Sequence, residues 1–251
     1  MRDPTTEGHF LNLTDAELDK HVYRIMRQEH VIELFTGRKN VLVQTHKWKD
    51  KFENFQLSLG GTINGERFPY GFKDAVVAQC WTSAGLSEAM WGIYASDCDK
   101  RFLRIRSTPR KLLRALTSAH PQMLQDTCFI GKVQYQSEAR IKRYAQTGGL
   151  FEPRAVTFAQ SLLLKRLAFK HECEVRLLYL GNQENYGTTG LYPYDVDPHN
   201  MVTQIMADPQ RNSVDWNAEK KALKKVTGFR GAIKRSKIYD PPNWAPPDFT
   251  A

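Results

Sequence analysis

Cysteine is scarce in this sequence. Its 251 residues include only four, Cys80, Cys98, Cys128 and Cys173, and no two of them form a C-x-x-C pair. Because structural zinc sites draw their thiolates from such close pairs, we expect no zinc site, and the spacing of the seven histidines gives no reason to expect another metal. Scattered free thiols are typical of a reducing compartment, so we expect a cytoplasmic protein.

Long apolar runs and common enzyme fingerprints are also missing. No apolar segment is long enough to span a bilayer, and residues 1–7 contain no apolar signal region, so we expect no membrane association. The chain contains no P-loop, G-x-G-x-x-G, H-E-x-x-H or G-x-S-x-G motif. The chain therefore lacks the sequence evidence for a P-loop or dinucleotide-binding protein, a zinc protease or a serine hydrolase.

Acidic residues are outnumbered by basic ones. The 36 Lys and Arg residues against 27 Asp and Glu give a net charge of +9. This balance favours an anionic partner, such as DNA or RNA, a phosphate-bearing cofactor or an acidic protein. A merely soluble surface would explain the same charge.

The excess of positive charge is concentrated in residues 218–237. This region has one acid, Glu219, against eight bases: Lys220, Lys221, Lys224, Lys225, Arg230, Lys234, Arg235 and Lys237. The pattern predicts a surface that contacts phosphate backbones, or alternatively a solvated helix face.

Hydrophobic patterning predicts short elements in an irregular order. The predicted strands are 40–44, 75–82, 101–106, 129–135, 172–180 and 232–239. The first predicted helix begins near residue 14, and the others span 28–35, 87–94, 108–118, 158–169 and 218–227. Residues 21–26 fit a strand or the start of a helix, 60–69 a loop or hairpin, and 200–207 a helical or mixed segment.

Strands and helices that do not alternate regularly argue against a doubly wound parallel sheet. We therefore expect a single α+β domain over residues 21–240, with mixed, mainly antiparallel sheets flanked by helices. A polar lead-in covers residues 1–20, and a Pro-rich tail, 241–251, is expected to wrap the surface.

The strand 172–180 carries two closely spaced carboxylates. A period of two places Glu172, Glu174 and Arg176 on one face, and the alternating apolar residues should face the core. The carboxylates would then lie roughly 6–7 Å apart along the strand. Such a pair can orient a sugar hydroxyl and stabilise a cationic transition state. The alternative is a surface strand with an ordinary Glu–Arg ladder.

Two further segments offer ligand-binding side chains. Thr82 and Ser83 end a predicted strand, where their hydroxyls could bond a ligand while Trp81 stacks on an aromatic ring. The following helix adds Trp91 and Tyr94, although tryptophans in such positions also serve to fill a core.

An arginine on an early strand is the third candidate. Arg24, next to Tyr23, could clamp a diphosphate in a bidentate manner or be a solvated side chain. The loop 46–53 mixes charges and aromatics, which suits a ligand-binding loop or an ordinary surface turn.

These segments together resemble a bacterial family known as domain of unknown function 2971. The resemblance rests on Tyr23-Arg24, Trp48 to Glu53, Cys80-Trp81-Thr82, Met90 to Tyr94, and Lys165 with Phe169 to Arg176. It extends over roughly Tyr23 to Tyr239. The sequence departs from the family pattern at Lys51, where proline is preferred, and at Phe169, where tryptophan is preferred.

The order of these motifs also looks like a distant ADP-ribosyltransferase arrangement. The resemblance implies that Arg24 binds the phosphates of NAD and that Thr82 and Ser83 support its nicotinamide-ribose pocket. It further implies that Glu174 stabilises the oxocarbenium-like transition state and that Glu172 activates the acceptor. The departure is that Cys80-Trp81-Thr82-Ser83 stands where that superfamily has Ser-Thr-Ser.

The resemblance implies an ADP-ribosyltransferase or NAD glycohydrolase that consumes NAD as its substrate, in a toxin or phage-defence role. Two alternatives remain. The first is a non-enzymatic nucleic-acid-binding protein, and the second is a nuclease with Asp50, Glu53, Glu172 and Glu174 around a metal, which has no support from spacing.

Overall fold

The computed structural model describes most of the chain: residues 8–48, 50, 52–53, 60–68, 74–85, 87–96, 101–121, 126–146, 154–210 and 213–245. Some predictions fall outside these residues, namely those on 1–7, Lys49, Lys51, Pro69, Cys98 and 246–251.

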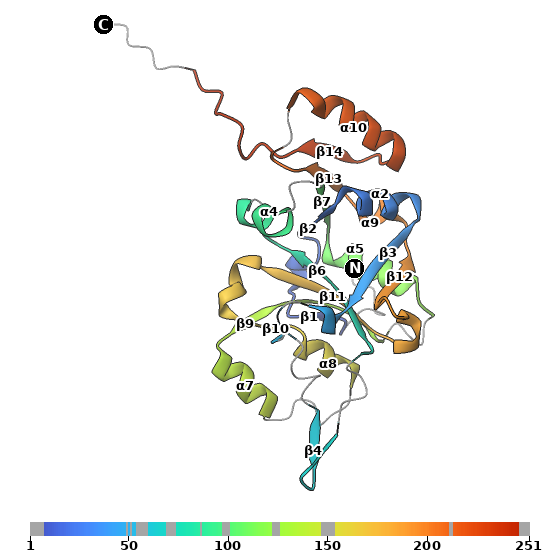
Figure 1. Ribbon diagram of the computed structural model, residues 1–251, viewed down its shortest axis with the longest axis vertical. Coiled ribbons are helices and arrows are strands. Elements are labelled where there is room, and N and C mark those ends of the chain that lie inside the picture. The colour runs from blue at the N-terminus through green and yellow to red at the C-terminus, as the bar shows by residue number, and fades with distance from the viewer. Residues whose placement is uncertain are drawn as a thin grey trace, which may run out of the picture.

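One large sheet organises the described residues (Figure 1). Its path runs β1 (Phe10–Leu11), β8 (Cys128–Lys132), β11 (Glu174–Leu180), β6 (Val76–Thr82), β2 (Val22–Arg27), β7 (Phe102–Ser107), β13 (Gln204–Ala207) and β14 (Ala232–Arg235). Two more strands branch from β6, because β3 (Lys39–Gln44) pairs with β6 and β12 (Leu191–Asp195) pairs with β3. Only β1–β8 and β13–β14 are parallel pairs within this sheet, so the predicted mixed, mainly antiparallel arrangement is confirmed.

The sheet splits beside β6. Strand β2 pairs with β6 at Tyr23↔Thr82, and β3 pairs with the same edge of β6 at Val43↔Ala78 and Gln44↔Val77. Between these contacts, no described strand pairs with Gln79–Trp81 on that edge. Strands β2 and β3 therefore diverge along the same edge of β6 and leave the sheet open between them.

Helices cover both faces of the sheet. They are α1 (Asp15–Leu18), α2 (Gln28–Thr36), α4 (Glu88–Tyr94), α5 (Pro109–Ser118), α7 (Glu138–Gln146), α8 (Ala155–Ser161), α9 (Pro198–Met201) and α10 (Ser213–Thr227). The 3₁₀ turns are η2 (Thr45–Lys47), η3 (Leu167–Glu172) and η4 (Gln183–Tyr186). None of the described helices has the length and apolar character of a membrane-crossing segment.

Alternation along the central strands builds two apolar cores. In β11, Leu177 joins the larger core with α2 and α5, whereas Leu178 joins the smaller core with Phe158 of α8. In β6, Val77 belongs to the larger core and Ala78 to the smaller one. Because both faces are covered, polar side chains on these strands are enclosed as well.

Local signals predicted several helix ends correctly. Thr14 and Glu17 form a capping box at α1, Ser87 caps α4, and Thr108 caps α5 with Pro109 at its first turn. Helix α2 ends at Thr36 with Gly37 as its C-cap, one residue beyond the predicted end, and the segment predicted as a loop or hairpin forms the hairpin of β4 (Gly61–Ile63) and β5 (Glu66–Phe68).

The predicted helix 158–169 is wrong. Helix α8 begins and ends earlier, and the chain continues as β10 (Leu164–Arg166), which pairs in parallel with β9 (Gln134–Gln136), and then as η3. Backbone pairing with a distant strand overrides the local helical pattern here.

Other boundaries also differ from the predictions. The ambiguous segment 21–26 is a strand, and 200–207 divides between the end of α9 and β13. Helix α10 begins at Ser213, and β14 ends at Arg235 rather than at 239. The described part of the tail leaves the body instead of wrapping it (Figure 1), and Trp244 is 84% exposed.

Candidate functional site

A cavity of about 240 Å³ lies at the split in the sheet. Strands β2, β3 and β6, helix α4 and the first residue of β11 contribute to its wall. The cavity brings together six of the predicted site residues: Tyr23, Arg24, Trp81, Thr82, Tyr94 and Glu174. Residues as far apart in the sequence as Tyr23 and Glu174 therefore meet at one cavity, because β6 is central to the sheet.

Arg24 is the cationic side chain of this cavity. It lies deep in the protein and is partly exposed, and no carboxylate of the described residues pairs with it. Burial lowers the pKa of its guanidinium, because removal from water disfavours the charged form. A second cavity, of about 300 Å³, shares Arg24, Val43 and Gln79 with the first. An anion in this cavity would lie next to the guanidinium of Arg24, which no described carboxylate neutralises, at the place where the two cavities adjoin.

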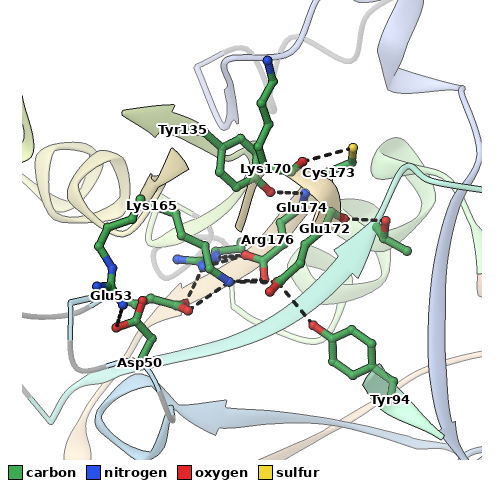
Figure 2. A network of polar contacts seen from close by, with 12 residues as sticks. Asp50, Glu53, Tyr94, Tyr135, Lys165, Lys170, Glu172, Cys173, Glu174 and Arg176 are labelled. Atoms are coloured by element: carbon green, nitrogen blue, oxygen red, sulfur yellow. Dashed lines mark hydrogen bonds and ion pairs between the residues drawn. The ribbon is translucent and has the colours of Figure 1, made fainter. Parts of the chain in front are cut away.

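Glu174, which also lines the cavity, belongs to a buried network of charges (Figure 2). The ammonium of Lys165 lies 3.0 Å from Glu53, 2.8 Å from Glu172 and 3.1 Å from Glu174. Arg176 donates from Nε to Glu174 at 2.7 Å and pairs through Nη2 with Glu53. The side chains of Lys165 and Arg176 are only 4% and 0% exposed, so these pairs are shielded from solvent.

Three carboxylates face two cations in this network, and the charge is shared unequally. Burial, and then the neighbouring carboxylate of Glu174, raise the pKa of Glu172. Burial alone would also raise the pKa of Glu174, but Arg176, Glu172 and Lys165 together hold it below its ordinary value. Glu174 is therefore the ionised carboxylate of the cavity, and Glu172 is the one that can carry a proton.

Tyr94 connects the network with helix α4. Its hydroxyl donates to Oε2 of Glu172 at 3.4 Å (Figure 2), and burial together with Glu172 raises the pKa of the phenol. The phenol therefore remains protonated, and its side chain lies between the cavity and Glu172.

The predicted exposed Glu-x-Glu-x-Arg face is wrong. Strand β11 begins at Glu174, Glu172 ends η3, and Cys173 between them has a left-handed backbone with φ of 46°. Both glutamates and Arg176 are buried. A turn in the chain, not the period of a strand, brings the two carboxylates into one network.

The hydroxyls of Thr82 and Ser83 hold this turn. Thr82 Oγ1 donates to the carbonyl of Glu172 at 2.6 Å, and Ser83 Oγ donates to the carbonyl of Cys173 at 3.1 Å. The backbone N–H of Ser83 donates to the same carbonyl at 3.0 Å. Both hydroxyls therefore position the turn, and their predicted contact with a ligand stays a prediction; of the two residues, Thr82 lines the cavity.

The two tryptophans fill the core. Trp81 is 2% exposed and donates from its indole to Gln79 at 2.8 Å, and Trp91 is 5% exposed. Trp81 still contributes to the cavity wall, whereas Trp91 does not line it. Stacking of a ligand on an open indole face is therefore not supported at either residue.

Sequence reasoning named Glu53 only as a metal ligand of the nuclease alternative, and it assigned no site role to Lys165 or Tyr135. Glu53 lies 123 positions from Arg176 in the sequence, and only the fold joins them. The hydroxyl of Tyr135 accepts the backbone N–H of Glu174 at 2.8 Å. Glu53 and Lys165 lie in the motifs that carry the family resemblance, which was the available signal.

The nuclease interpretation meets an obstacle in the same network. The ammonium of Lys165 occupies the space among Glu53, Glu172 and Glu174 that a shared metal ion would need. Within the described ranges, no group of three or more His, Cys, Asp or Glu side chains is arranged to hold a metal.

The fold and site thus define a mixed α+β protein with a split central sheet and a buried carboxylate–cation network. No protein-family model matches the chain, and no curated protein matches it, so the resemblance to domain of unknown function 2971 stays a prediction. Among solved structures, the chain is similar to DarT of Thermus sp. 2.9 in complexes with NAD+ and with ADP-ribosylated ssDNA, each with a TM-score of 0.41 and 10% identity. These alignments cover 87% of this chain and 96% and 95% of those chains. The complex with carba-NAD+ gives a TM-score of 0.39 and 9% identity, with 87% and 96% covered. A likeness this weak shows neither a family nor an activity.

Proposed function

We propose that the chain is an NAD-consuming enzyme of the ADP-ribosyltransferase or NAD glycohydrolase type. One observation carries the proposal: the cation of Arg24, which pairs with none of the described carboxylates, and the ionised carboxylate of Glu174 line the same cavity. NAD presents a diphosphate and, when nicotinamide leaves, a cationic ribose. The two side chains have the charges that these two groups require.

In this proposal, Arg24 binds the diphosphate. The guanidinium pairs with phosphate oxygens, which would remove the free-energy cost of an uncompensated buried charge. The two cavities that share Arg24 would receive the two halves of the dinucleotide, with the nicotinamide riboside on the side of Glu174. Tyr23 and Thr82 contribute to the wall of that side.

Glu174 stabilises the ribose cation as the glycosidic bond to nicotinamide breaks. The pairs with Lys165 and Arg176 keep Glu174 ionised and fix its position, so little reorganisation is needed when the charge develops. Glu172 does not line the cavity itself; it accepts the proton of the incoming nucleophile through the hydroxyl of Tyr94, which donates to it, and this role suits a carboxyl group with a raised pKa. The nucleophile is water in a glycohydrolase, or a group on a protein or nucleic acid in a transferase.

A toxin or phage-defence role belongs to the same proposal, since loss of NAD or modification of a macromolecule would be harmful to a cell. A non-enzymatic nucleic-acid-binding protein is the second candidate, and the exposed lysines of α10 favour it. In that case, the buried network would serve only stability.

Release of nicotinamide from NAD tests the proposal. We expect turnover by the unaltered chain and a loss of about 100-fold or more in Glu174→Gln, because one electrostatic stabiliser is worth roughly this much. Glu53→Gln is the matched control, since it removes a carboxylate from the same Lys165 and Arg176 pairs but does not line the cavity.

Thermal unfolding of both variants separates chemistry from stability. If they lose equal stability while only Glu174→Gln loses turnover, the catalytic role of Glu174 is supported. Absence of nicotinamide release with protein, DNA, RNA and water as acceptors, or equal turnover by Glu174→Gln, would contradict the proposal.

A further inference from the structure

Four lysines form one exposed flank of helix α10. Lys220 and Lys224 lie four residues apart, as do Lys221 and Lys225, so each pair is stacked and the two pairs are adjacent. All four side chains are exposed, and none of them has an ion pair with a described residue. They are the α10 basic face of the molecule.

The acids of the same helix lie elsewhere. Asp215 and Glu219 are also four residues apart, but the helical period places them on the other flank. Glu219 pairs with Arg101 at 2.8 Å. Leu223 is buried between the flanks, in one core with Ile233 of β14. The positive charge of the α10 basic face is therefore not neutralised by its own helix.

The basic residues in and next to the edge strand β14 differ in whether they form ion pairs with described residues. Arg235 pairs with Asp240 through two bonds of 2.7 and 2.6 Å, so its charge is already balanced within the chain. Arg230 and Lys234 are exposed and have no ion pair with a described residue. They lie before and within β14, which packs against α10.

Register connects this edge with the cavity. Lys234 pairs across the strands with Met206, Met206 with Arg104, and Arg104 with Ile25. Ile25 lines the cavity, and the guanidinium of Arg104 stacks 4.5 Å from the ring centre of Tyr23, which lines it too. This row of side chains lies on the sheet face opposite α10, because Ile233, next to Lys234 in the strand, packs with Leu223 of α10. Arg104 within the row is buried.

Two exposed aromatic side chains follow β14. Tyr239 is 53% exposed and donates to Glu88 of α4, whose other end carries Tyr94 of the cavity. Trp244 is 84% exposed on the tail that leaves the body (Figure 1). Exposed aromatic rings beside lysines are the combination that binds stacked bases and phosphates of single strands.

We propose that the α10 basic face, continued around the edge strand β14 by Arg230, Lys234, Tyr239 and Trp244, is a docking surface for single-stranded nucleic acid. The lysines contact the phosphates, and the aromatic rings stack with bases that a duplex would keep inside. The binding is independent of NAD chemistry.

Fluorescence anisotropy with labelled 20-nucleotide single strands of DNA and RNA, in the absence of NAD, tests this proposal. The quadruple change of Lys220, Lys221, Lys224 and Lys225 to Gln should weaken binding about tenfold or more near 0.15 M salt. The slope of log affinity against log salt should fall by roughly 0.7 for each phosphate that is no longer neutralised. The corresponding four Lys→Arg changes keep the charge and should keep the binding.

A matched control removes four exposed cations from other parts of the surface: Lys20, Arg67, Arg140 and Lys142, each changed to Gln. It has the same net charge as the α10 variant and should bind within about twofold of the unaltered chain. The double change of Tyr239 and Trp244 to Ala should weaken single-strand binding about fivefold or more, because it removes both stacking rings.

Several results would overturn the proposal. They are an equal loss in the control variant, tighter binding of a 20-base-pair duplex than of the single strand, or binding of anionic phospholipid vesicles in place of nucleic acid.

Because none of the four lysines pairs with a described residue, the unfolding temperatures of the variants should match. If the quadruple variant does not fold, the pair Lys224→Gln and Lys225→Gln gives the same test. Nicotinamide release, measured separately, tells a failed docking surface from a failed enzyme.

Discussion

Replacement of Lys165 by methionine is the most direct test of the buried network. The change removes the cation that lies within 3.1 Å of three carboxylates and leaves Arg176 to balance all of them. Removing one partner of a buried ion pair costs about 3–5 kcal/mol of unfolding free energy. Because the change breaks three pairs, we expect a cost of about 4 kcal/mol at pH 8.

Proton binding should make this cost depend on pH. The pKa of Glu172 is already raised in the folded protein, and loss of Lys165 would raise it further. A group whose folded pKa exceeds its unfolded pKa stabilises the folded state below the unfolded pKa, and this contribution is lost as pH rises through the folded pKa. The cost of Lys165→Met should therefore be smaller at pH 5 than at pH 8, by roughly 1.4 kcal/mol for each unit of additional pKa shift.

Urea unfolding at pH 5 and pH 8 measures both effects, with Lys170→Met as the control. Lys170 is exposed in the same segment, and its replacement should change the stability by about 0.5 kcal/mol or less. A cost for Lys165→Met below about 1 kcal/mol at pH 8, or a cost that grows as the pH falls, would refute the reasoning.

Three further outcomes follow from the site. Arg24→Gln should weaken binding of NAD about tenfold or more in calorimetry while leaving stability equal or higher, because it removes a deep-lying cation without a carboxylate partner; unchanged affinity would exclude Arg24 from the ligand site. Cys173→Val should cost about 1–2 kcal/mol in urea unfolding, because a β-branched residue disfavours φ of 46°, whereas Cys173→Gly should cost less; equal costs would mean that this backbone is not constrained. Nicotinamide release should rise with pH as Glu172 loses its proton, at a pH above the ordinary glutamate value of about 4.3, because its pKa is raised; the same profile in Glu172→Gln would assign the pH dependence to another group.

Local patterns were sufficient for much of the fold. The ends of α1 and α5 follow from Thr14 with Glu17 and from Thr108 with Pro109, because capping depends on neighbours in the sequence. The segment 158–169 failed for the opposite reason. Its apolar residues fit a helix, but pairing of Leu164–Arg166 with a strand about thirty residues earlier decided its conformation.

The candidate site was also predictable from the sequence only in part. The chemistry of Arg24, Glu172 and Glu174 was visible in the sequence, and Arg24 and Glu174 do meet at one cavity. The roles of Thr82 and Ser83 were not, because whether a hydroxyl contacts a ligand or a carbonyl depends on what lies opposite it. Their partners belong to a turn 90 positions away.

By itself, the sequence determined which charges and hydroxyls are present, where most helices and strands begin, and that the C-terminal region is strongly basic. Tertiary structure alone decided which of those charges are neutralised. It buried Glu53, Lys165 and Arg176 around the two glutamates, paired Arg235 with Asp240, and left Arg24 and the lysines of α10 without a described carboxylate partner. The physical reason is that the pKa and the pairing of a charged group depend on distance through space and on burial, and neither can be obtained from spacing along the chain.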